Sequence, residues 1–280
     1  MSRIITLTTD FGLTDGFVGA MKGVILSINP DATLVDITHA IAPHAQRIEQ
    51  GAFLFAASAR YFPANAIHVV VIDPGVGSTR RAIALQAGET IYVAPDNGVL
   101  SLAIRDWRLE TLRESPISNL QSPIRAVHLN RPAYWLPRVS NTFHGRDLFA
   151  PVAAHLSLGA PLEALGDPID DWVRLSWCAA AFRSGDEIAG RVVHIDRFGN
   201  IVTNIGEEML AGMDRARIVV RIGGRVVRGV KTTYADAARG ELIALISSAW
   251  QLEVAVCEGS AAQTLGARLG DEIAVALDRE

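Results

Sequence analysis

Along the first two-thirds of the chain, short β-branched runs alternate with segments whose apolar residues recur at helical spacing. The pattern predicts strands over residues 3–9, 32–37, 67–72 and 90–94, and helices over 16–27 and 47–58. The run at 67–72 is apolar at nearly every position, which is typical of a strand buried on both faces of a parallel sheet. Strands and helices in this alternation predict an open α/β sheet.

From about residue 184 the pattern changes to short strand-like runs separated by turn residues. Strands are predicted over 190–195, 201–205, 217–222, 225–230, 241–246, 252–256 and 272–277. Gly223-Gly224 stands between two of these runs and indicates a hairpin. We therefore expect an N-terminal α/β domain over residues 1–184 and a smaller C-terminal all-β, barrel-like domain over residues 185–280.

Composition and charge narrow the function classes. The 280 residues carry 26 Lys+Arg against 30 Asp+Glu, which argues against a nucleic-acid-binding protein. The longest apolar runs, such as 51–59 and 66–72, are too short for a membrane span, and no targeting segment is visible. Two cysteines, Cys178 and Cys257, make neither a disulfide framework nor a Cys-rich zinc site. We expect a cytoplasmic protein.

Three polar turns directly follow predicted strands: 10–15, 73–77 and 96–98. In open α/β sheets, ligands bind beyond the carboxyl ends of the strands. These turns are therefore the first candidates for a functional site.

The turn that begins at Asp73 reads Asp-Pro-Gly-Val-Gly and continues to Arg80. It lacks the Gly-Lys-Ser/Thr ending of a phosphate-binding P-loop. Asp73 at a strand end could pair with Arg80 seven residues later, or the segment could be a structural turn with a solvated arginine. Further along, Asn-Thr-Phe-His144-Gly-Arg-Asp147 groups an imidazole, a guanidinium and a carboxylate, for which catalytic and structural roles are both open.

Other polar clusters are less specific. His39 and His44, with aspartates near them in sequence, match no metal-binding spacing, so no metal is expected. In the second domain, the segments 196–204 and 232–237 combine carboxylates, amides and aromatic rings. Asp and Asn in such loops are commonly turn residues, so ligand binding and turn formation both remain open there.

Four segments, in this order, resemble the S-adenosylmethionine hydroxide adenosyltransferase family: 73–77, 95–98, 141–147 and 198–204. That family hydrolyses S-adenosylmethionine and is related to the fluorinase and chlorinase. The resemblance runs over nearly the whole chain and implies a catalytic set of Asp73, Arg80 and His144.

The halogenases carry an aromatic residue where this chain has Asp73. A carboxylate there would repel a halide anion, so we expect hydrolysis of S-adenosyl-L-methionine to adenosine and L-methionine. The alternatives are a non-catalytic protein that binds adenosine or S-adenosylmethionine, and a 5′-halogenating relative.

The resemblance also implies substrate contacts, a homotrimer and no cofactor. The implied substrate-binding residues are Asp10, Asp15, Asp196, Phe198, Asn200, Tyr234 and Ser248. Asp10 would bind the ribose hydroxyls, while Asp196 and Ser248 would meet the ammonium and carboxylate of the methionine. Asn200 would hydrogen-bond to an edge of the adenine, and the rings of Phe198 and Tyr234 would stack on it. In the family, each site lies between the N-terminal domain of one subunit and the C-terminal domain of the next.

The chain departs from its relatives in two places. His44 stands where the halogenases have a tryptophan against the ribose. Ser247-Ser-Ala-Trp250-Gln replaces the more usual Asn-Ser-x-Gly run. The second departure falls on the residues expected to contact the methionine carboxylate.

Overall fold

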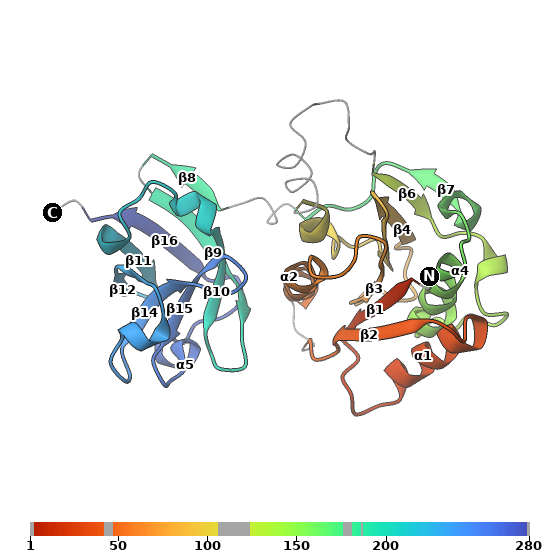
Figure 1. Cartoon of the computed structure of the whole chain (residues 1–280), viewed down its shortest axis with the longest axis horizontal. Helices are drawn as coiled ribbons and strands as arrows, with labels where there is room; N and C mark the ends of the chain where they lie inside the picture. The colour runs from red at the N-terminus through yellow and green to blue at the C-terminus, as the bar shows by residue number, and fades with distance from the viewer. Residues whose placement is uncertain (1–2, 42–46, 106–123, 176–180, 186, 279–280) are drawn as a thin grey trace. The chain divides into compact units, whose positions relative to one another are not determined.

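The computed structural model describes residues 3–41, 47–105, 124–175, 181–185 and 187–278. The chain forms two compact units, Met1–Leu175 and Ser176–Glu280, and each has its own hydrophobic core (Figure 1).

The first unit is built on a seven-stranded sheet of order β2-β1-β3-β5-β4-β6-β7. Its strands are β1 (Ile4–Thr9), β2 (Thr33–Thr38), β3 (Ile67–Val71), β4 (Ala82–Ala87), β5 (Thr90–Pro95), β6 (Arg125–His128) and β7 (Asp167–Ile169). β2, β1, β3 and β5 are parallel, and β4, β6 and β7 extend the sheet in antiparallel fashion. The predicted α/β sheet is confirmed.

Helices cover both faces of this sheet (Figure 1). They are α1 (Phe17–Ile28), α2 (Arg47–Ala59) and α4 (Ala150–Ser157). α1 and α4 pack on the face that carries Leu7 and Val69. On α2, Gly51 approaches the end of β3 so closely that a Cβ there would lie 2.9 Å from Ile72. Coverage from both sides explains why every residue of β3 is buried.

The sequence pattern did not reveal β4, β6 or β7 of this sheet. β4 reads Ala-Ile-Ala-Leu-Gln-Ala, and alanine has little preference for strands. The segment becomes a strand because β5 and β6 pair with it on both sides.

The second unit is a nine-stranded, barrel-like sheet of order β12-β11-β16-β9-β10-β15-β14-β13, with β8 paired to β9. The strands are β8 (Phe182–Ser184), β9 (Glu187–Ile195), β10 (Ile201–Gly206), β11 (Ile218–Ile222), β12 (Arg225–Arg228), β13 (Val230–Lys231), β14 (Leu242–Ile246), β15 (Gln251–Val256) and β16 (Glu272–Leu277). A short helix, α5 (Ala261–Leu265), precedes β16. Gly223 and Gly224, both at positive φ, connect β11 to β12 as the predicted hairpin.

Strand pairing also locates the start of the second unit. Phe182 of β8 pairs with Ala189 of β9. The predicted boundary at 184/185 thus separates two strands that the structure joins in one sheet. Within the described residues, no helix is long and apolar enough to cross a membrane.

Candidate active site

The predicted pair of Asp73 and Arg80 is present at the carboxyl end of β3. Nε of Arg80 donates a hydrogen bond to Oδ1 of Asp73 at 2.9 Å, and Nη2 donates to Oδ2. The two side chains are only 5% and 11% exposed. Two parallel, charge-assisted bonds fix both groups in one plane. The alternative of a solvated arginine is therefore wrong.

His144 joins this pair from a loop 64 residues further along the chain. Nη2 of Arg80 also lies 2.8 Å from Nδ1 of His144. The two loops approach closely at Gly77, which has φ +78°, and a Cβ there would lie 2.5 Å from the carbonyl oxygen of Asn141. Glycine permits both the backbone conformation and the contact. The three residues that the resemblance assigns to catalysis thus form one contact set.

The contact with Arg80 decides where His144 carries its proton. A guanidinium can only donate, so Nδ1 of His144 is the acceptor and the neutral ring carries its hydrogen on Nε2. Burial and the positive charge of Arg80 lower the pKa of His144, although the charges of Asp73 and Asp147 and a hydrogen bond with the backbone of Ser140 oppose the shift. The imidazole is therefore neutral at pH 7.

We expect His144 to titrate below the usual histidine value of about 6.5, and Arg80→Gln to raise its pKa by removing a neighbouring positive charge. Nuclear magnetic resonance titration of the histidine ring signals measures both values. His155 in α4 is the internal control, because burial alone lowers its pKa. A His144 pKa at or above about 6.5 in the unaltered protein, or one unmoved by Arg80→Gln, contradicts the assignment.

Asp10 lies at the end of the neighbouring strand. β1 and β3 are in register up to Thr9 and Val71, so the turns that follow them start from the same edge of the sheet. Burial raises the pKa of Asp10; Nε of Arg47, 3.3 Å from Oδ2, counteracts this, and the negative charge of Asp73 adds to the rise. The structure therefore brings Asp10 into the field of Asp73, whereas Asp15 lies exposed in the following loop.

Residues 95–98 form hydrogen bonds that hold the backbone next to Asp73. Nδ2 of Asn97 donates to the carbonyl of Ile72, immediately before Asp73, at 2.8 Å. Asp96 accepts hydrogen bonds from Arg81 and from the backbone N–H of Val173. These side chains hold the chain in place rather than facing a ligand, a role that the sequence pattern did not indicate.

A buried carboxylate holds the loop that carries His144. Asp147 is fully buried and accepts hydrogen bonds from the backbone N–H and the hydroxyl of Ser140, at 2.8 and 2.7 Å, and from Nε of Arg146 at 2.6 Å. It lies in a π-helical turn, Gly145–Phe149, that starts directly after His144. Such turns recur at functional sites. Asp147 thereby fixes both ends of the loop.

Replacing Asp147 by asparagine is expected to lower the free energy of unfolding at pH 7 by about 2 kcal/mol. Burial alone raises the pKa of Asp147, but the hydrogen bonds from Arg146 and Ser140 outweigh it and hold the pKa below 3.8. The carboxylate therefore stabilises the fold above pH 3.8 and loses this contribution as the pH falls through the lower, folded-state pKa.

Urea unfolding at pH 7 and at more acidic pH measures the effect, and the difference between the two proteins should shrink toward low pH. Asp167→Asn is the matched control, because Asp167 also bonds an arginine and a neutral donor but is exposed. An equal loss of stability in both variants contradicts the role of burial.

Aromatic rings surround the His144 loop. Phe143 contacts Phe11 and Phe17 edge to face, with ring centroids 5.6 and 5.1 Å apart. Gly145 passes directly beside Phe11, where a Cβ would lie 3.1 Å from the ring. The guanidinium of Arg80 lies 5.4 Å from the ring centroid of Phe149. The charged groups of the site are thus bordered by apolar surface.

In the second unit, Asp196 organises the loop between β9 and β10. Its Oδ1 accepts hydrogen bonds from the backbone N–H groups of Phe198 and Asn200, and its Oδ2 accepts from Nδ2 of Asn200 at 3.0 Å. Gly199, at φ +85°, completes the turn. Turn formation is therefore shown for Asp196, and the amide of Asn200 is held with its oxygen as the remaining acceptor.

Tyr234 is close to this loop and reveals a residue that the sequence analysis missed. Its hydroxyl donates to Oε1 of Glu253 at 2.5 Å. Glu253 is only 4% exposed, and the charge of Asp196 acts on both side chains. A single glutamate within the apolar strand Leu-Glu-Val-Ala-Val was the available signal.

Ser248 lies at the other end of β15. The strand pairs Ile201 with Val254 and Gly206 with Gln251, so the turn before Gln251 lies next to the Gly206 end of β10. In this turn Trp250 adopts φ +62° and is 58% exposed. Bulky residues rarely adopt this conformation, whereas glycine does so freely. The backbone at position 250 therefore suits the glycine of the more usual run.

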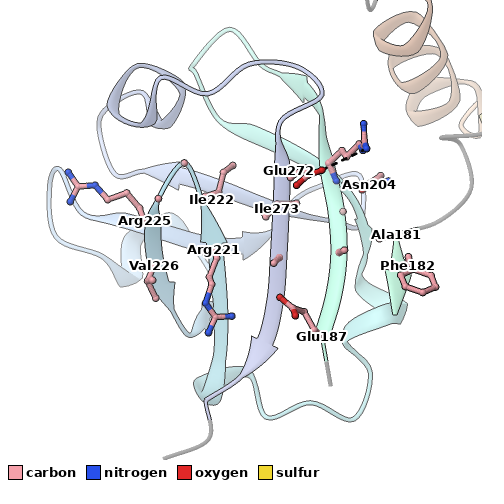
Figure 2. A pocket seen from close by; sticks show the side chains of 16 residues that line it. Ala181, Phe182, Glu187, Asn204, Arg221, Ile222, Arg225, Val226, Glu272 and Ile273 are labelled. Carbon is pink, nitrogen blue, oxygen red and sulfur yellow. Dashed lines mark hydrogen bonds and ion pairs between the residues drawn. The ribbon is translucent and has the colours of Figure 1, made fainter. Parts of the chain in front are cut away.

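The large open hollow in the second unit, about 1010 Å³, lies elsewhere (Figure 2). β8, β9, β10, β11, β12 and β16 line it, with charges of both signs such as Glu187, Arg221 and Glu272. None of the seven predicted substrate-binding residues lines it.

Among the described residues, no three His, Cys, Asp or Glu side chains gather to hold a metal ion. His44 and Cys178 lie outside the described residues.

Comparison with known proteins extends over both units. Residues 5–166 match the family model of the SAM hydroxide adenosyltransferase N-terminal domain, and residues 190–274 match that of its C-terminal domain. An (R)-S-adenosyl-L-methionine hydrolase from Salinispora tropica is 38% identical over 97% of both chains. One from Thermus thermophilus is 38% identical over 96% of this chain and 97% of its own.

More distant relatives and a solved structure agree with this. A fluorinase from Nocardia brasiliensis is 28% identical over 97% of this chain and 96% of its own. The crystal structure of an uncharacterized conserved protein from Thermotoga maritima superposes with a TM-score of 0.82 at 34% identity, over 98% of this chain and 99% of that one. Since the two family models together match both units of the fold, the chain belongs to the SAM hydroxide adenosyltransferase family.

Proposed function

We propose that the protein hydrolyses S-adenosyl-L-methionine to adenosine and L-methionine by direct attack of water on the 5′ carbon. The observation that carries this is the contact set of Asp73, Arg80 and His144, in a chain 38% identical to a named hydrolase. A protein that only bound the nucleoside would have no need to bury an ion pair and a neutral imidazole together.

The chemistry requires few groups. The oxygen of water forms a bond to the 5′ carbon as the carbon–sulfur bond breaks, and the electron pair of that bond moves to sulfur. The leaving group is a neutral thioether, so no general acid is required. A proton is lost from the attacking water, and a base that accepts it assists the attack. The attacking oxygen carries partial negative charge and the sulfonium sulfur carries positive charge. These charges neutralise each other as the new bond forms, and apolar surroundings favour that neutralisation.

The protonation states of the side chains separate the roles of the three residues. His144 accepts at Nδ1 from Arg80 and carries its hydrogen on Nε2, so in this tautomer it has no free lone pair with which to take a proton from water. Asp73 has further lone pairs beyond those that Arg80 occupies and accepts the proton, which then passes to solvent. Arg80 holds both groups in position. A carboxylate at this place also disfavours a halide nucleophile.

Substrate binding is proposed on the pattern of the family. Asp10, beside Asp73, binds the ribose hydroxyls, with Asp15 at the edge of the same turn. Asn200 accepts from the adenine amino group, between Phe198 and Tyr234. Asp196 and Ser248 meet the ammonium and carboxylate of the methionine. The site is completed between subunits of a homotrimer. The enzyme works in the cytoplasm, without metal, cofactor, nucleic acid or membrane.

The decisive experiment is incubation of metal-free protein with S-adenosylmethionine in ¹⁸O-labelled water, with and without chloride, followed by chromatography and mass spectrometry. Label at the 5′ oxygen of adenosine, independent of chloride, supports the proposal. Intact substrate indicates a binding protein, and a 5′-chloro product indicates a halogenating enzyme. Because the relatives are named for the (R) form, both sulfonium epimers are compared.

A further inference from the structure

One buried carboxylate of the second unit has no part in the proposed chemistry. Glu253 lies on β15 between Leu252 and Val254, whose side chains are fully buried in the barrel core. Side chains alternate along a strand, so Glu253 points to the opposite, outer face of the barrel. It is nevertheless only 4% exposed there. A carboxylate in such a place needs a hydrogen-bond donor.

Tyr234 provides this donor. Its hydroxyl lies 2.5 Å from Oε1 of Glu253. Burial and the hydrogen bond to Glu253 raise the pKa of Tyr234, so the phenol keeps its proton and remains the donor. Burial and the charge of Asp196 raise the pKa of Glu253, and the bond from Tyr234 counteracts that rise. The two side chains are therefore coupled.

The backbone of Tyr234 is fixed separately from its hydroxyl. Tyr234 starts a short helical turn, Tyr234–Asp236. Oδ2 of Asp236 accepts from the backbone N–H groups of Thr232 and Thr233, at 3.1 and 3.0 Å. With the chain held by Asp236 and the hydroxyl held by Glu253, the aromatic ring has little freedom. Yet the residue is 43% exposed, so part of the ring stays open.

An exposed aromatic ring that is held at both ends suits the stacking of a planar heterocycle. The Asp196 loop, whose charge acts on Tyr234, adds a second exposed ring, Phe198, at 70%, and the buried amide of Asn200 with its free acceptor. Ordering a side chain in advance lowers the cost of binding. A loose tyrosine would have to be ordered by the ligand instead.

We propose that Glu253 is a positioning residue that holds the Tyr234 ring as a stacking platform for the adenine of the substrate. The inference rests on the proposed function, and it assigns Glu253 to substrate binding rather than to bond cleavage. Glu253 acts through Tyr234 and does not touch the reacting atoms.

Four variants of the full chain test this: Glu253→Leu, Glu253→Gln, Tyr234→Phe, and the double variant of Glu253→Leu with Tyr234→Phe. Glu253→Leu and Tyr234→Phe each remove the bond and are expected to raise KM about 3- to 10-fold with kcat nearly unchanged. Glu253→Gln keeps an acceptor oxygen and is expected to stay within about twofold of the unaltered KM. The double variant should resemble either single variant, because both remove one interaction.

Two further measurements separate positioning from a purely structural role. Thermal unfolding of Glu253→Leu should show no loss of stability, since an apolar side chain replaces a buried charge. Calorimetric titration with adenosine should show the same 3- to 10-fold weakening as KM. A lower Tm with unchanged KM, an additive double variant, or a Gln variant as impaired as the Leu variant would each overturn the proposal.

The adenosine titration also distinguishes this inference from the proposed function. If the unaltered protein fails to hydrolyse S-adenosylmethionine but binds adenosine, the proposed function is wrong and the platform is still tested by the variants. If hydrolysis proceeds and adenosine affinity is the same in all four variants, only the role of Glu253 is wrong.

Discussion

Replacement of Asp73 by asparagine is expected to reduce kcat at least about 100-fold, the low end for the loss of an acid–base group. Asparagine has nearly the same shape and can still accept from Arg80 with its oxygen, but its amide nitrogen faces a guanidinium donor and cannot take a proton from water. KM should change far less, because the carboxylate acts on the attacking water. Chromatographic measurement of adenosine formation gives both constants.

Asp171→Asn is the matched control for this prediction. Asp171 also pairs with an arginine, Arg81, but its side chain is 71% exposed and forms no part of the contact set. Its kcat is expected to stay within about twofold, as for most exposed ion pairs. An Asp73→Asn protein that is folded and retains more than about a tenth of the original kcat would remove Asp73 from the role of proton acceptor.

The second large effect is expected for Arg80→Lys, which should lower kcat about 10- to 100-fold. One guanidinium donates to both oxygens of Asp73 and lies against Nδ1 of His144. A lysine keeps the charge but has no planar fork, so it cannot hold the carboxylate and the imidazole in one plane. The loss therefore measures geometry rather than charge.

Arg125→Lys controls for the general effect of this substitution. Arg125 likewise bridges a carboxylate and a neutral acceptor, Glu163 and Gln86, but is 51% exposed and pairs with the end of β4 opposite to Arg80. It should leave kcat unchanged. If Arg80→Lys keeps full activity, the bidentate geometry is dispensable and the charge alone suffices.

Much of the candidate site could be predicted because its parts are encoded locally. Asp73 follows a short, β-branched, apolar run, a pattern typical of a buried strand. The turn residues after the run mark the carboxyl end of that strand, β3. The same holds for Asp10 after β1. The order of the motifs predicts the family, and the family models match residues 5–166 and 190–274, which contain these motifs.

Other residues owe their roles to contacts that no local pattern contains. Asn97 looks like any turn asparagine until its amide reaches the carbonyl of Ile72, 25 residues earlier. Glu253 stands out as a single glutamate in an apolar strand, but nothing in the local sequence shows that its partner is the hydroxyl of Tyr234, 19 residues earlier. β4 becomes a strand through pairing rather than through its alanine-rich sequence.

The sequence by itself determined the two-part organisation and the strand ends that carry Asp73 and Asp10, because periodicity and turn residues act over a few neighbours. The family was indicated separately, by the resemblance of four motifs in order along the chain. The tertiary structure decided that His144 meets Arg80 across 64 residues, and on which nitrogen its proton lies. It also decided that Asp147 is buried and that Glu253 holds Tyr234. Burial and proton position depend on which loops meet in space, and that follows from strand register and close packing rather than from local sequence.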